Sequence, residues 1–232
     1  MVNIDTVYQR VLTIANKEQR GYITPLEFNL MANQAQLDVF EQYFYDKNQN
    51  EKIPGNDTDY SDVSGMLNEK ISMFETFGNI GGGTQLPNDL YRLNTVNIDA
   101  IGNGNIREAE YVDHQDWTRL RHSPLTAATN DRPVYTRDSN GVFVIAANNE
   151  QVFANITCNY IRQPNKVEWG YDVVNEMALY QPATSVNFEH HPSDETELVM
   201  KILELAGIII NKPGLVQIAG NEDIQKIQQE KM

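Results

Sequence analysis

The segment from Ile23 to Phe28 marks the start of a helix more sharply than any other part of the chain. Thr24 can cap the amides two and three residues later, and Pro25 stands at the first helical position, where no amide donor is needed. Glu27 can accept a hydrogen bond from the amide of Thr24, which completes a capping box. Ile23 and Phe28 occupy the two positions of a hydrophobic staple around this cap. Together these features predict a sharply fixed angle between two helices.

Helical periodicity continues on both sides of this junction. Apolar residues three and four apart predict one helix over about 5–16 and a second from Pro25 to about Tyr45. A polar loop is predicted over 46–60, because it contains Pro54-Gly55-Asn56-Asp57. A third helix follows this loop, and its apolar face holds Val63, Met66, Leu67, Ile71 and Phe74.

The middle of the chain has the spacing of β structure. From Leu90 the apolar period changes toward two, which is typical of strands. The segment 134–146, with the turn Asp138-Ser139-Asn140-Gly141, is the clearest β-hairpin. One long strand is predicted over residues 151–162. The region 90–163 is therefore predicted to be small, β-rich and mostly antiparallel.

Helix returns after His191-Pro192-Ser193. Three acids fall in the first turn, where the helix dipole favours negative charge. The apolar residues from 199 to 210 supply a broad face that must be buried, and Lys212-Pro213-Gly214 ends the helix. Because neither the N-terminal nor the C-terminal apolar faces can be left in water, each requires the other as a partner.

The expected fold class is α+β. We expect a helical bundle formed by the N- and C-terminal helices, with 1–86 plus 187–232 as a helical connector core. Residues 87–186 would form a small, β-rich, antiparallel insertion in this core. Residues 213–232 carry too few apolar side chains to offset the entropy lost on ordering. We therefore expect them to be a docking tail that is mobile in the free subunit and orders against a neighbouring subunit or the adjacent ring.

The formal net charge of −14 is unevenly distributed. Residues 1–89 hold 13 acids and 6 bases, 90–163 hold 8 acids and 7 arginines, and 164–232 hold 11 acids and 5 lysines. Specific nucleic-acid binding calls for a clustered basic footprint, which this pattern does not provide. No apolar run approaches the length of a transmembrane helix, so we expect no membrane partner.

The sequence offers little for catalysis or metal binding. The short motifs of serine, zinc and kinase sites do not occur. Cys158 is alone in a strand-like setting, which favours a buried small hydrophobe over a nucleophile. Glu189-His190-His191 could ligate a metal, but adjacent histidines point in different directions on any regular element. We therefore expect no enzyme activity, no cofactor and no metal site.

A calcium-binding helix pair is an alternative interpretation. With Asn16 as position 1 of a twelve-residue loop, Gly21 falls at position 6 and Glu27 at position 12, the skeleton of an EF-hand. Arg20, however, places a cation at a ligand position. A second partial match begins at Asp46 but lacks the turn glycine. The capped helix–turn–helix explains these residues better, and a small enzyme with an unrecognised site is a further alternative.

The run 16–29, NKEQRGYITPLEFN, opens a series of short segments that together resemble a known family. They resemble structural ring proteins of short-tailed bacteriophages, notably crAss-like phages, which are similar to tail tubular protein A of other podoviruses. The family resemblance covers nearly the whole chain in order. The later segments are LPNDLYR at 86–92, SPLT at 123–126, RPVY at 132–135, NYIR at 159–162, KVEWGY at 166–171, HPSDETEL at 191–198 and the Gln-rich 225–231.

This resemblance implies a virion structural protein. It would be an adaptor subunit of a ring in the phage neck or tail, a dodecamer by family analogy, that joins the portal to the tail. Its partners would be copies of itself, the portal protein and neighbouring tail or ring proteins. Packaged DNA would pass through the channel without specific binding. The subunit would be made in the host cytoplasm, and the family offers no catalytic residues to carry over.

Closed rings use two different faces of each subunit, so two interface regions are needed. The middle third uses only arginine as its cation, which suits interfacial pairing better than lysine. The tail offers sparse apolar side chains as a second region. The candidate interface residues are therefore Arg92, Arg107, Arg119, Arg121, Arg132, Arg137 and Arg162, with Ile218, Ile224 and Ile227 in the tail.

Overall fold

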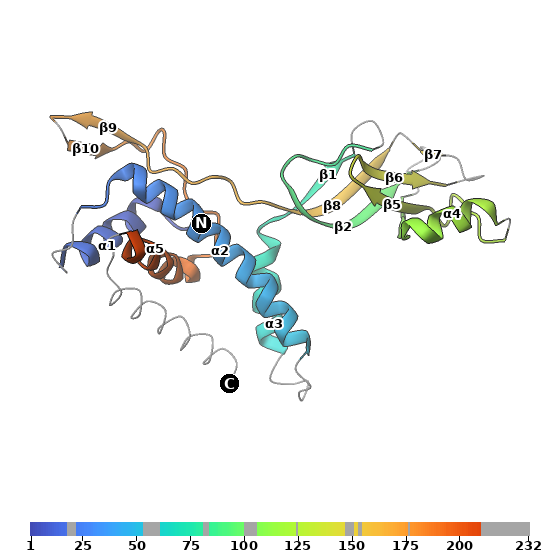
Figure 1. Cartoon of the computed structure of the whole chain (residues 1–232), viewed down its shortest axis with the longest axis horizontal. Coiled ribbons are helices and arrows are strands. Elements are labelled where there is room, and N and C mark those ends of the chain that lie inside the picture. The colour runs from blue at the N-terminus through green and yellow to red at the C-terminus, as the bar shows by residue number, and fades with distance from the viewer. Residues whose placement is uncertain are drawn as a thin grey trace. The chain divides into compact units, whose positions relative to one another are not determined.

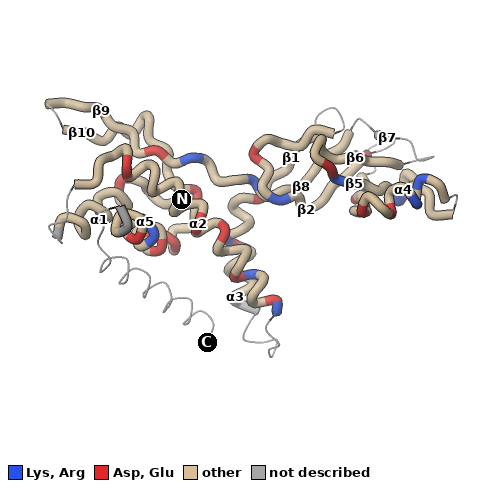
Figure 2. The backbone as a smooth tube through the Cα atoms, in the orientation of Figure 1, with Lys and Arg blue, Asp and Glu red and all other residues tan. Residues whose placement is uncertain are grey.

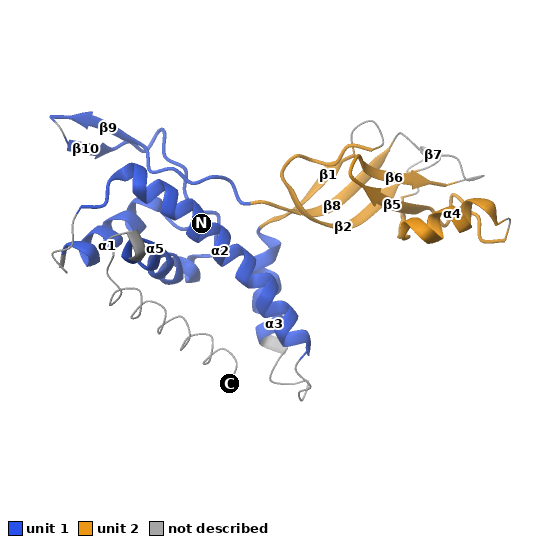
Figure 3. Ribbon diagram, in the orientation of Figure 1, with its two compact units in different colours: residues 1–73, 164–232 blue, residues 74–163 orange. Residues whose placement is uncertain are grey.

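The protein is α+β and divides into two compact units (Figures 1 and 3). Unit 1 comprises residues 1–73 and 164–232, and unit 2 comprises residues 74–163. The computed structural model describes residues 1–17, 22–52, 61–80, 84–99, 106–123, 125–146, 151–152, 155–175 and 177–209. Residues 53–60 of the loop predicted over 46–60 and the predicted tail at 213–232 lie outside the described residues.

Unit 1 is built from helices of both chain ends. Helix α5 packs against α1 and α2, and α3 packs against α2. The buried side chains of α1 recur at helical spacing, with Ile4, Val7 and Val11 fully covered. The elements are α1 (Ile4–Lys17), α2 (Pro25–Lys52), α3 (Ser61–Ser72), strands β9 (Tyr171–Val174) and β10 (Met177–Tyr180), the 3₁₀ turn η2 (Pro192–Asp194) and α5 (Glu195–Ile209).

The predicted start of α2 is confirmed. The amide of Thr24 donates to the Glu27 carboxylate at 2.9 Å, and the amide of Glu27 donates to the Thr24 hydroxyl at 3.3 Å. Ile23 and Phe28, the predicted staple, are both buried. The prediction that 46–60 is a loop is wrong for residues 46–52, which continue α2. Pro54 is the first residue that helix geometry disfavours, and nothing before it interrupts the backbone hydrogen bonds.

Side-chain amides on one face of α2 hold the chain that returns from unit 2. Asn33 Nδ2 donates to the carbonyl of Val167 at 2.8 Å, and the amide of Val167 donates to Asn33 Oδ1 at 3.0 Å. Asn29 forms the same pair with Trp169, at 3.3 and 2.8 Å. Gln36 Nε2 donates to the carbonyl of residue 165 at 2.7 Å. The backbone groups that form these hydrogen bonds belong to every second residue of the segment. The three side-chain amides therefore pair with it as a neighbouring strand would.

Unit 2 contains two four-stranded sheets with a shared core. The strand orders are β1-β8-β2-β3 and β4-β5-β6-β7. Val96 and Cys158 from the first sheet and Val142 and Val144 from the second belong to one buried cluster. The elements are β1 (Glu75–Asn79), β2 (Leu90–Ile98), β3 (Arg107–Glu108), β4 (Glu110–Tyr111), α4 (His114–His122), β5 (Val134–Asp138), β6 (Gly141–Ile145), β7 (Gln151–Val152) and β8 (Ile156–Arg162).

Helix α4 covers a second, smaller cluster of unit 2. Ala128, Val134 and Ile145 are buried in it, and Trp117 of α4 packs against them. Asp113 is the N-cap of α4, and its side chain accepts a hydrogen bond from the amide of His114. The predicted single strand at 151–162 is wrong, because β7 and β8 lie in different sheets. Asn155 interrupts it with a φ of 57°, a left-handed conformation that asparagine tolerates better than most residues.

The boundaries of the two units differ from the predicted ones, which placed the β-rich insertion at residues 87–186. Strand β1 belongs to unit 2 because it pairs with β8 from Glu75↔Ile161 to Asn79↔Thr157. Residues 164–186 belong to unit 1, since the amides of α2 hold 165–169 and Glu168 pairs with Val186. Pairing partners far away in the sequence therefore decide both boundaries.

We predict that Asn33→Ala destabilises unit 1 by about 2 kcal/mol, because it leaves both backbone groups of Val167 without their partner. Asn68→Ala, at an exposed position of α3, has the same gain in helix propensity and should change little. Urea unfolding followed by Trp169 fluorescence, in a Trp117→Phe background, measures both variants. Equal midpoints for the two variants would show that the amide pairing contributes no stability.

A second prediction concerns the β5–β6 turn. Gly141 has a φ of +131°, and a Cβ there would lie 1.9 Å from the carbonyl oxygen of Thr84. Gly141→Ala should therefore destabilise unit 2 by more than about 2 kcal/mol. Gly65→Ala is the matched control, since its Cβ meets nothing within 4 Å and the change favours helix. Hydrogen exchange of the β5–β6 amides should accelerate in the first variant only.

Candidate assembly surfaces

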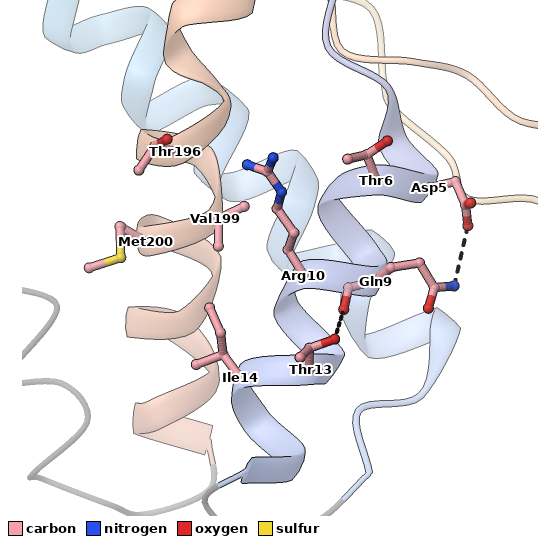
Figure 4. A pocket seen from close by; sticks show the side chains of 9 residues that line it. All are labelled: Asp5, Thr6, Gln9, Arg10, Thr13, Ile14, Thr196, Val199 and Met200. Atoms are coloured by element: carbon pink, nitrogen blue, oxygen red, sulfur yellow. Dashed lines mark hydrogen bonds between the residues drawn. The ribbon is translucent and has the colours of Figure 1, made fainter.

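A groove runs between α1 and α5 of unit 1 (Figure 4). Its volume is about 590 Å³, and Figure 4 shows Arg10 and Ile14 directed from α1 toward α5. The inner face of α1 is already buried in the core, so its lining side chains come from the adjacent, more polar face. The lining residues are Asp5, Thr6, Gln9, Arg10, Thr13 and Ile14 from α1 and Thr196, Val199 and Met200 from α5.

Mostly uncharged side chains line this groove. Ile14 and Met200 contribute apolar surface, and the aliphatic stem of Arg10 adds to it. The Arg10 guanidinium forms an ion pair with Glu195 at 3.0 Å, which joins α1 to α5. Both partners reach solvent, so the pair contributes little free energy. The groove thus exposes apolar surface among polar side chains, and its lining holds two charged residues, Asp5 and Arg10.

The β9–β10 hairpin exposes apolar side chains on both of its faces. Val173 is 68% exposed on one face, and Met177 and Leu179 are 63% and 51% exposed on the other. An isolated two-stranded hairpin is marginally stable in water, and exposed apolar patches commonly mark contact sites. Neither face of this hairpin is fully covered by unit 1, so it is available to a partner.

The base of the hairpin is anchored in the helical core through Trp169. The Trp169 ring stacks on Tyr171 and Tyr180, with centroid distances of 5.8 and 5.6 Å. On the core side it packs against Tyr8 at 4.5 Å. Its indole Nε1 donates to Asp5 Oδ1 at 2.9 Å. Because Asp5 also lines the groove, one carboxylate contacts both the groove wall and the base of the hairpin.

A buried carboxylate fixes the start of α5. Asp194 is fully buried, and its two oxygens accept from Lys70 Nζ and the Tyr43 hydroxyl, each at 2.7 Å. Burial by itself raises the pKa of Asp194, but the hydrogen bonds from Lys70 and Tyr43 outweigh it and hold the pKa below its ordinary value. Burial and the nearby Asp194 carboxylate raise the pKa of Tyr43. This network joins α2, α3 and the turn η2, which leads directly into α5.

His190 lies beside this network and is fully buried. Its ring centroid is 5.8 Å from that of Tyr43. Burial lowers the pKa of His190 to about 4, against the charges of Asp194 and Glu189, which raise it. The imidazole is therefore neutral at pH 7 and serves as a packed core side chain.

The structure separates the residues considered for metal binding. His190 points toward Tyr43, whereas His191 Nδ1 lies 2.8 Å from the Ser193 hydroxyl. Within the described ranges, no three His, Cys, Asp or Glu side chains are grouped as a metal ion would require. The second partial calcium loop, from Asp46, begins inside α2 instead of a loop. In the first, the Glu27 carboxylate is engaged by Thr24.

The seven candidate arginines all lie in unit 2, but on several elements. The ion pairs within the unit include Arg107 with Asp131 at 3.4 Å, Arg119 with Asp116 at 3.1 Å and Arg132 with Glu110 at 2.9 Å. Arg92 lies on β2, Arg121 on α4, Arg137 on β5 and Arg162 on β8. Their role at an interface stays a prediction. Ile218, Ile224 and Ile227 lie outside the described residues.

Sequence reasoning missed both the groove and the hairpin. The segment 171–180, YDVVNEMALY, does carry a signal, because Asn175 between two apolar pairs favours a tight turn. Asn175 has a φ of 50°, as such a turn requires. The groove has no signal in the sequence, since it depends on how α5 packs beside α1.

No model of a known protein family matches this chain, and no curated protein matches its sequence. Among the described helices, none is both long enough and apolar enough to cross a membrane. Figure 2 shows basic and acidic positions interspersed along the described backbone of each unit. The described residues therefore do not present the single basic tract that nucleic-acid binding calls for.

We predict that unit 1 loses stability as the pH falls from about 6.5 to about 4. The unfolded chain protonates His190 in this range while the folded chain does not, so the unfolding free energy falls by about 3 kcal/mol. His190→Gln should flatten this part of the pH profile. His122→Gln, at an exposed position of α4, is the control and should leave it unchanged. Urea midpoints at stepped pH values test this, and equal slopes in all three proteins would contradict it.

Proposed function

We propose that this protein is a structural ring subunit of the neck or tail of a short-tailed bacteriophage, where it joins the portal to the tail. It would act as an adaptor of the tail tubular protein A type and surround the DNA exit channel. In this proposal, the helices of both chain ends form a bundle that serves as the connector core, and the β-rich unit is inserted in it. The protein would be part of the virion and not an enzyme.

One structural observation carries this proposal beyond the sequence resemblance. Unit 1 has two unlike apolar surfaces, the α1–α5 groove and the β9–β10 hairpin. A closed ring of identical subunits requires such a pair, because each subunit contacts its two neighbours through different faces. A protein that acts alone has no need of a projecting apolar hairpin.

The charge of the chain supports a role around passing DNA. The two segments of unit 1 together hold 11 more acidic than basic residues. An acidic surface repels the DNA phosphates, so DNA could pass through the channel without forming attractive contacts with its wall. Copies of the subunit would repel one another as well, so apolar contacts must supply the attraction within the ring.

The location of the protein in the particle tests this proposal. A phage that carries a peptide tag on this subunit should show gold label at the neck or tail by electron microscopy, because the proposal places every copy in that ring. A reconstruction of the same particles would show the copy number. The untagged phage is the control for the label. Purified infectious particles that lack the protein by mass spectrometry would overturn the proposal.

A further inference from the structure

We propose that the β9–β10 hairpin of one subunit inserts into the α1–α5 groove of the next copy of this chain. This inference rests on the proposed ring function for the neighbour's identity, and it assigns the two surfaces to each other. It concerns the described residues of unit 1 alone.

The hairpin has the properties of an inserted arm. Val173 and Val174 at the end of β9 and Met177 at the start of β10 are all exposed, and they flank the turn on both faces. Its stacking on Trp169 holds the base while the tip projects (Figure 1). A two-stranded hairpin with apolar side chains on both faces gains stability only when a partner covers them.

The groove has the matching properties of a receptor. Its volume of about 590 Å³ is enough for several aliphatic side chains, and Ile14 and Met200 offer them apolar contacts. The hairpin segment 171–180 carries two acids and no base, and the groove lining holds one cation, Arg10, and one carboxylate, Asp5. Arg10 already pairs with Glu195 at 3.0 Å, so the match between the hairpin and the groove rests on the apolar contacts.

A second copy of the chain is the occupant that these observations favour. None of the described hairpin residues lines the groove of its own subunit, and in Figure 1 the hairpin lies on the other side of α2 from α5. A protrusion and a recess at different places on one rigid unit produce a head-to-tail contact that every copy can repeat. The contact needs no other protein.

Cysteine cross-linking of the full-length protein tests this contact. Val173→Cys and Ile14→Cys proteins are mixed in equal amounts at high concentration and oxidised mildly. We expect a disulfide-linked dimer that joins the two different variants, in an excess of about tenfold over the homodimer of either, the ratio produced by a preference of about 1.4 kcal/mol. The native Cys158 is buried and burial raises its thiol pKa, so the unmodified protein supplies the background.

Two further variants make the result decisive. Leu125→Cys replaces an almost fully exposed leucine of unit 2, so its cross-linking to Val173→Cys measures random collision. Met177→Asp added to Val173→Cys should abolish the specific dimer without changing the melting temperature, because Met177 is exposed. Equal yields with the Ile14 and Leu125 partners would overturn the inference. Predominant Val173 homodimers would overturn it too, and would indicate edge-to-edge pairing of hairpins.

The same cysteines can be used in purified phage particles to separate this inference from the proposed function. Cross-linking of Val173→Cys to Ile14→Cys between copies in the particle supports both. Cross-linking of Val173→Cys only to another virion protein overturns the inference but leaves the neck assignment standing. If the purified protein forms the specific dimer but is absent from particles, the contact between hairpin and groove is supported and the assignment to the phage neck or tail is overturned.

Discussion

The pairing of α2 side chains with the backbone at 165–169 is the interaction on which the rest of unit 1 depends. Asn29, Asn33 and Gln36 occupy one helical face and pair with alternate residues of an extended segment. This segment follows the β-rich unit in the chain and precedes the hairpin and α5. The three amides therefore close the helical unit around its insertion and set the position of Trp169, from which the hairpin projects.

The buried ionic network has a different role from these neutral amides. Asp194, Lys70 and Tyr43 come from three separate helical elements, so their contacts are satisfied only when α2, α3 and the start of α5 are all in place. A buried ion pair adds little net free energy, but removing one partner leaves an uncompensated charge. The network therefore discriminates against alternative packings of α5. His190, packed beside it in the neutral state, makes the arrangement sensitive to protons.

The two surfaces of unit 1 share a physical connection. Asp5 lines the groove and accepts the hydrogen bond of the Trp169 indole, while Trp169 stacks on both strands of the hairpin. The recess and the protrusion are thus built on one rigid set of contacts and keep a fixed relation within the subunit. The ring proposed for this protein would need such a fixed relation, because each copy must present its two faces at the same angle for the ring to close.

The sequence by itself determined the local elements of this protein. The Thr24–Glu27 cap, the helix over 4–17, the turn before Gly141 and the cap of α4 all follow from neighbouring residues, whose hydrogen bonds form within a few positions. The tertiary structure decided the break at Asn155, the assignment of β1 to the β-rich unit, the amide pairing on α2 and the groove between α1 and α5. Each of these depends on contacts between residues that are distant in the sequence, in some cases by well over a hundred positions. A local sequence pattern does not predict such contacts, because many distant partners compete for each residue.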